Sequence, residues 1–237
     1  GEEKEFVSKT NEILLKLSST LLLKSSTSLG SSSEKPKVIV QRNVENEFYD
    51  AGLLAAYTEA EWEELNEEID HSRDENFTYV AMEQWRGKYL VQNRVTGEIF
   101  ETPQIAYMLI AATLFQHYPT DIRMRWVKDY YHAVSKFDIS LPTPIMAGVR
   151  TSQKQFSSCV LIETDDSLDS INATSSSIVR YVSQKAGIGI GAGRIRALGS
   201  PIRKGDAYHT GVVPFYKLFQ AATRSCSQGG VRNGAAT

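Results

Sequence analysis

The chain has 237 residues, 41% of them hydrophobic and 10% aromatic, with a formal net charge of −2, so it can form one large or two small domains with a substantial core. It holds no apolar run near the roughly 20 residues of a membrane span and no signal-peptide layout, so we expect neither a membrane protein nor a secreted one. Two cysteines are too few for a disulfide scaffold, which favours the reducing cytoplasm.

Residues 1–43 are expected to be a serine-rich extension and linker. The apolar residues recur at the spacing of an amphipathic helix, at Phe6, Ile13, Leu14, Leu17 and Leu21. The stretch "KSSTSLGSSSEKPK" follows, and its serines and proline are typical of a flexible linker. Nothing in this region indicates chemistry.

Residues 44–150 predict a mainly helical domain. Apolar and acidic residues alternate at three- and four-residue steps in "VENEFYDAGLLAAY" and "TEAEWEELNEEID", and Thr58 with Glu61 forms a capping box for the second helix. The stretch "GKYLVQNRVTGEIFE" predicts a hairpin turning at residues 96–97.

Two further helices are predicted before the character of the sequence changes. Thr102 and Pro103 begin one in "TPQIAYMLIAATLFQHY", and the other starts the same way from Thr120. The prolines and glycine of "ISLPTPIMAGVRT" then predict an extended or looped segment rather than a helix.

Residues 151–237 predict an α/β fold. The order of elements indicates a parallel unit, the start of a barrel or doubly wound sheet. These elements are the strand "FSSCVLIE", the helix "DSLDSINATSSSIVRYVSQKA", the glycine-rich loop "GIGIGAGRIRALGSPIRKGD" and the helix "TGVVPFYKLFQAATRSC". Residues 121–237 carry fifteen basic against eight acidic residues, whereas residues 45–76 carry one against twelve. The second half is therefore suited to anions such as phosphates.

Cys159 lies in the predicted strand, and the residues leave two interpretations open. It is either a small core residue or a thiol kept for its chemistry, because Ser157 and Ser158 are small polar neighbours, unusual in a strand buried on both faces. Neither Cys159 nor Cys226 belongs to a metal site, since zinc needs about four ligands and no histidine lies at ligand spacing.

Acidic and glycine-rich stretches on either side of the helix predicted at residues 166–186 also allow two interpretations. Asp166 or Ser167 can cap the helix, or a carboxylate at the end of the strand can bind a ribose hydroxyl. The glycine-rich loop is either a mobile basic surface or a phosphate site. Its basic residues follow within a dozen positions: Arg194, Arg196, Arg203 and Lys204. No lysine stands in a P-loop frame.

The stretches "ISLPTPIMAGVRT", "QFSSCVLIETDDSLDSINATSS", "GIGIGAGRIRALGSPIR" and "SCSQGGVRNGAAT" closely resemble the large subunit of class I ribonucleotide reductase, of the class Ia bacterial and phage type. The resemblance implies a helical N-terminal part followed by the first strands of a ten-stranded α/β barrel. It also implies that Cys159 is one of two thiols that reduce the ribose after a cysteine radical removes the 3′ hydrogen.

The resemblance further implies binding residues for substrate and effector. The substrate-holding groups are Thr143, Ser158, Ala186 and Gly187. The residues around a deoxynucleotide effector are Asp166, Ser167, Arg196 and Arg203. The loop that reports the effector's identity contains Cys226, Ser227, Gln228, Arg232, Asn233 and Gly234.

The resemblance implies that this chain holds no metal or cofactor. It also implies that ATP or dNTP effectors bind the chain and that a metal-containing small subunit supplies the radical. The other implied partners are a ribonucleoside diphosphate, thioredoxin or glutaredoxin, a second copy bound through two helices, and a complementary C-terminal polypeptide, because the other catalytic cysteines are not in this sequence. Gly191 stands where the family would have asparagine. The alternative is a catalytically inert nucleotide-binding or dimerisation module.

Overall fold

The computed structural model describes residues 34–226, which divide into two compact units between Lys154 and Gln155. We expected the division at residue 150. The helical unit extends further, and Lys154 at its end forms an ion pair with Asp50 of the same unit at 2.7 Å.

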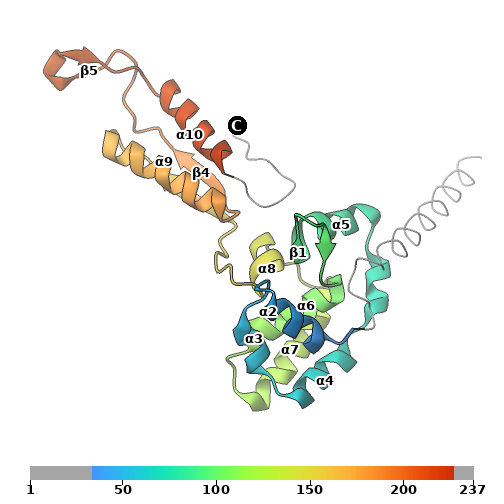
Figure 1. Ribbon diagram of the computed structural model, residues 1–237. Helices are drawn as coiled ribbons and strands as arrows, with labels where there is room; N and C mark the ends of the chain where they lie inside the picture. The colour runs from blue at the N-terminus through green and yellow to red at the C-terminus, as the bar shows by residue number, and fades with distance from the viewer. Residues whose placement is uncertain (1–33, 227–237) are drawn as a thin grey trace, which may run out of the picture. The chain divides into compact units, whose positions relative to one another are not determined.

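The first unit is mainly helical, as predicted. Its described elements are α2 (Pro36–Glu45), α3 (Ala51–Ala56), α4 (Glu59–Glu68), the 3₁₀ helix η1 (His71–Asn76), α5 (Tyr79–Gln84), the π-helix η2 (Trp85–Tyr89), β1 (Gln92–Asn93), β2 (Glu98–Ile99), α6 (Pro103–Phe115), α7 (Thr120–Ser135) and α8 (Thr143–Gly148). Strands β1 and β2 form the predicted hairpin, and Gly97 in its turn has φ 77°. In Figure 1 the helices of this unit gather around α6.

Helix α6 is the centre of the first unit, because its residues 103–113 are all buried. It begins as predicted: the Thr102 side chain accepts a hydrogen bond from the Ile105 amide, and Pro103 occupies the first turn, where its missing N–H costs nothing. The capping box of Thr58 and Glu61 is also present at α4. Helix α7 differs, since Pro119 rather than a side-chain cap precedes it.

Two segments expected to lack helical structure are helical. Helix α2 begins at Pro36, inside the range we assigned to the linker, because Ile39 and Val40 are fully buried and anchor it in the core. Helix α8 occupies the segment that we predicted to be a loop. Its prolines do not prevent it: Pro142 precedes the helix and Pro144 lies in its first turn, positions where proline removes no helical hydrogen bond.

A buried charged network links the segment after β2 to the segment after α8 in the first unit. Glu101, after β2, and Arg150, after α8, form an ion pair in which both side chains are completely buried. Arg150 also donates to the carbonyl oxygens of Met146 at 2.7 Å and Tyr89 at 3.1 Å. The Tyr49 hydroxyl donates to Glu101. Burial, together with the Glu101 charge, raises the pKa of Tyr49 well above its usual range, so the phenol stays neutral.

The second unit contains a strand–helix–strand motif with a parallel pair, as predicted. Its described elements are β3 (Cys159–Glu163), α9 (Leu168–Ser183), β4 (Gly187–Gly191), β5 (Pro201–Ile202), the 3₁₀ turn η3 (Arg203–Gly205), β6 (Ala207–Tyr208) and α10 (Val213–Ser225). Strands β3 and β4 are parallel, with Cys159 opposite Gly187. Among the helices in residues 34–226, none is both long and apolar enough to cross a membrane.

Candidate functional site

The parallel pair β3–β4 has one covered face and one open face. Ile162, Ile188 and Ile190 pack into an apolar cluster with residues of α9 and α10, which lie side by side along the sheet (Figure 1). The opposite face carries the alternate residues of β3, all of them exposed: Cys159, Leu161 and Glu163. A strand whose second face is open to solvent does not place its cysteine in a hydrocarbon core.

Cys159 is a free, exposed thiol at the beginning of β3. A Cβ added to Gly187, its partner in the register, would lie 3.3 Å from the Cys159 sulfur and 3.4 Å from the Ser158 carbonyl oxygen. The Gly187 amide donates to that oxygen at 2.9 Å, which fixes the spacing of the strands. Of the predicted substrate-binding residues, Ser158 precedes the cysteine, Gly187 lies opposite it, and Ala186, next to Gly187, is buried.

Three glycines that we assigned to a loop lie in β4. The first is Gly187. Cβ atoms at Gly189 and Gly191 would collide with the side chains of Leu161 and Glu163, whose atoms lie across the two glycines. The glycines therefore permit the side chains of β3 to lie flat over β4, and residues 187–191, which we assigned to a loop, form a strand.

Asp166 and Arg196 form the polar centre at the carboxyl end of the strands. The Arg196 backbone amide donates to Asp166 Oδ1 at 3.1 Å, and its guanidinium Nε donates to Oδ2 at 2.5 Å. Hydrogen bonds from the backbone and side chain of Arg196 hold the pKa of the Asp166 carboxyl below its ordinary value. Ser167, rather than Asp166, caps α9 by accepting from the Ser170 amide at 3.1 Å. Asp166 is thus free of the helix and committed to the arginine.

A second, exposed ion pair joins Asp165 to Arg194 at 2.8 Å. The sequence did not indicate this partner for Asp165. Arg203 lies on the β5–β6 turn with φ 50°, and its charged contact is the Asp206 carboxylate at 4.0 Å. The described residues thus bring Asp166, Ser167 and Arg196 together, whereas Arg203 contacts another acid.

The remaining predicted residues lie elsewhere. Thr143 is the first residue of α8, in the helical unit, and its convergence with Ser158 stays a prediction. Cys226 directly follows α10 as a free, partly buried thiol packed against the apolar cluster of the second unit. The other residues assigned to the specificity loop lie outside the described residues: Ser227, Gln228, Arg232, Asn233 and Gly234. Within residues 34–226 no three metal-binding side chains gather.

Family comparisons cover both units. Residues 75–154 match the model described as the ribonucleotide reductase all-alpha domain, and residues 157–237 match its barrel domain. The chain is 66% identical over 198 residues to ribonucleoside-diphosphate reductase 1 subunit alpha of Escherichia coli strain K12. It is 56% identical over 189 residues to the subunit alpha of Enterobacteria phage T4 and 32% identical over 219 residues to that of Treponema pallidum.

These matches cover most of this chain and a small part of each relative. They include 84%, 80% and 90% of this chain, respectively. The chain spans only about a quarter of the length of the curated relatives it matches, namely 26%, 25% and 26%.

Proposed function

We propose that this chain supplies one reducing thiol and an effector site to a ribonucleoside-diphosphate reductase. The chain belongs to the family of class I ribonucleotide reductase large subunits and contains the all-alpha region and the start of the barrel domain. The predicted family and fold class are confirmed, and the barrel is not closed within this chain. Its role in the reaction, its effectors and its partners are proposed.

The exposed Cys159 thiol on an open, glycine-lined sheet face carries the proposal. A cysteine radical elsewhere in the enzyme takes the ribose 3′ hydrogen, the 2′ hydroxyl leaves as water, and the same cysteine returns the hydrogen atom to C3′ at the end of the reaction, which restores its radical. Cys159 and a second thiol then supply two electrons and two protons to the sugar and become a disulfide. Because Gly187 has no side chain, nothing at that position of β4 blocks approach of a sugar to the sulfur.

The pair Asp166–Arg196 is the proposed anchor of a dNTP or ATP effector. Both groups are partly exposed, with 29% and 40% of the side-chain surface accessible. A ribose hydroxyl can donate to the Asp166 carboxylate, which leaves guanidinium N–H groups of Arg196 available for phosphate oxygens. Arg203, on the β5–β6 turn, would add a second cation if that turn folds over the triphosphate.

Helices α9 and α10 are the proposed contact with a second copy of the chain. Their inner faces cover β3–β4, yet each also carries large exposed apolar residues: Leu168, Val179, Val213, Tyr216 and Leu218. Apolar surface of this kind on two adjacent helices favours association with an equivalent pair. A dimer formed in this way places the two effector sites near the interface.

The rest of the active site is proposed to come from residues that this sequence does not contain. The 237 residues hold two cysteines, and Cys226 packs against the cluster on the covered side of the sheet. The second reducing thiol and the radical-bearing cysteine must therefore lie on further large-subunit sequence, on the same polypeptide or a complementary one. A small subunit would generate the radical, and thioredoxin or glutaredoxin would restore the dithiol.

The proposal is tested by CDP reduction in an assembly of this chain, the remaining large-subunit sequence and the radical-generating small subunit. Cys159→Ser should abolish dCDP formation, whereas Cys226→Ser should retain it. Equal activity of both variants would contradict the role of Cys159.

The alternative, an inert nucleotide-binding module, is favoured by the intact Asp166–Arg196 pair in a chain with a single candidate catalytic cysteine. It predicts dTTP or dATP binding that Arg196→Ala weakens, with no reduction by the assembled enzyme.

A further inference from the structure

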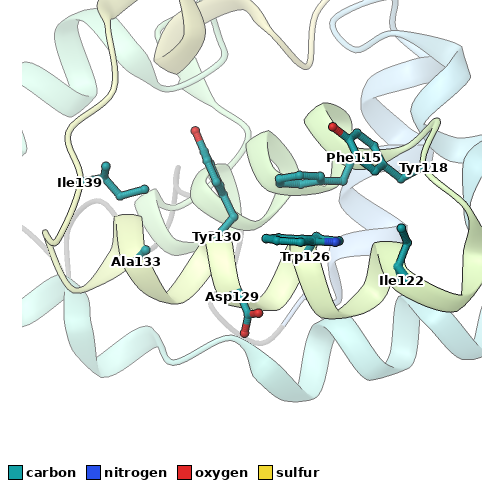
Figure 2. A pocket seen from close by; sticks show the side chains of 8 residues that line it. All are labelled: Phe115, Tyr118, Ile122, Trp126, Asp129, Tyr130, Ala133 and Ile139. Carbon is teal, nitrogen blue, oxygen red and sulfur yellow. The ribbon is translucent and has the colours of Figure 1, made fainter.

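The first unit carries an apolar hollow that the proposed function does not use. It has a volume of about 550 Å³ and lies along the outer face of α7, between the end of α6 and the turn after α7 (Figure 2). The residues that line it are mainly aromatic and aliphatic: Phe115, Tyr118, Ile122, Trp126, Asp129, Tyr130, Ala133 and Ile139. The only charged one, Asp129, already lies 3.5 Å from Arg125.

Helix α7 therefore has two apolar faces. One face is buried in the core through Val127, Tyr131 and Val134. The second face carries Trp126, 47% exposed, whose ring stacks on Phe115 at a centroid distance of 6.3 Å and an interplanar angle of 16°. A surface helix of a globular protein normally presents polar residues on its outer face, so this apolar hollow indicates a segment that covers it.

The hollow has the length of a short amphipathic helix. Its α7 residues run from Ile122 to Ala133, about 16 Å at the rise of an α-helix. Helix-in-groove recognition needs an apolar row of similar length, with residues three or four positions apart. The N-terminal row Ile13, Leu14, Leu17 and Leu21 meets that requirement, spanning about 12 Å in helical form.

The described fold begins beside α4, a helix that contacts α7. Lys35 binds Glu63 of α4 at 2.7 Å, and α4 is joined to α7 by the ion pair of Glu64 and Lys128 at 2.6 Å. The chain thus starts beside α4, one helix away from α7. Residues 22–33 can span up to about 40 Å, four times the diameter of a helix, so the apolar row can reach the hollow.

We propose that the N-terminal segment around residues 13–21 of this chain binds in the hollow, with its isoleucine and leucine side chains against Trp126, Tyr130 and Ile139. This segment is chosen as the occupant because only residues 22–33 separate it from the described fold, and so short a tether gives it a high effective concentration at the hollow. The segment would complete the outer face of α7. This inference is independent of the proposed reductase function.

Acrylamide quenching of tryptophan fluorescence in the complete chain tests the inference. Trp62 and Trp85 are each 2% exposed and resist the quencher, so the quenchable signal belongs to Trp126. We expect Trp126 to be shielded in the wild type. In Leu14→Asp/Leu17→Asp its quenching constant should rise roughly twofold or more, because a side chain with 47% exposure becomes accessible again.

Ser18→Asp/Ser19→Asp is the matched control, because it adds the same charge to the same segment without removing apolar side chains. It should quench like the wild type. The unquenched emission of Trp62 and Trp85 shows that each variant is folded. Equal quenching of Trp126 in the wild type and in Leu14→Asp/Leu17→Asp would overturn the inference. Shielding that disappears on dilution would also overturn it, by assigning the hollow to a second copy.

Discussion

The buried pair of Arg150 and Glu101 makes the sharpest stability prediction. Arg150→Met should destabilise the helical unit by about 3–5 kcal/mol, the usual cost of removing one partner from a buried ion pair, because the Glu101 carboxylate would remain buried without its cation. The carbonyl oxygens of Met146 and Tyr89 would lose their donors as well. For a unit of this size the loss corresponds to a drop in melting temperature of roughly 10–20 °C.

Thermal unfolding followed by circular dichroism measures this drop, with urea unfolding as a second determination. Arg125→Met is the matched control, because the Arg125 side chain is 81% exposed beside Asp129 and exposed ion pairs contribute about 0–1 kcal/mol. If Arg150→Met and Arg125→Met lower the melting temperature by the same small amount, the buried network does not stabilise the fold as argued.

Three further predictions concern two single positions and the second unit. Burial raises the pKa of Asp74 from 3.8 to about 7. The protonated carboxyl therefore contributes its full stabilisation below pH 3.8, and this contribution is lost as pH rises through 7. The melting temperature of Asp74→Asn, measured across pH 4–8, should depend less on pH than that of the wild type. Gly191→Asn should force the Glu163 carboxylate off β4, which a crystal structure of the variant would reveal, and an unmoved Glu163 would contradict the packing described. The second unit should melt broadly and at low temperature without its partner strands, because its two-stranded sheet leaves one face uncovered, whereas a sharp transition would contradict this.

Elements specified by local signals could be predicted from the sequence. Thr102 and Pro103 mark the start of α6, Thr58 and Glu61 cap α4, and the glycine at position 97 turns the hairpin, since each effect depends on neighbours within a few residues. The errors arose where the same local signals have two outcomes. A proline can end a helix, but a proline before or within the first turn is compatible with the start of one. The prolines of α8 lie at its start.

Features that join distant residues could not be predicted from local patterns. The sequence indicates that Asp166 and Arg196 are suited to a nucleotide, yet their contact joins residues 30 positions apart. The glycines of β4 predicted a loop, because glycine is typical of loops. Their role is to leave room for side chains of β3, and only the strand register reveals it. The Glu101–Arg150 pair, 49 positions apart, gave no sequence signal because each residue alone looks like a surface charge.

The oxidation state of Cys159 after a single turnover tests the account most directly. The assembled, prereduced enzyme converts CDP once without external reductant, and the remaining thiols are then alkylated and identified by mass spectrometry. We predict that Cys159 is protected from alkylation as part of a disulfide in proportion to the dCDP formed, while Cys226 remains a free thiol. Formation of dCDP with Cys159 still fully alkylated would contradict the assignment of this thiol as the reductant.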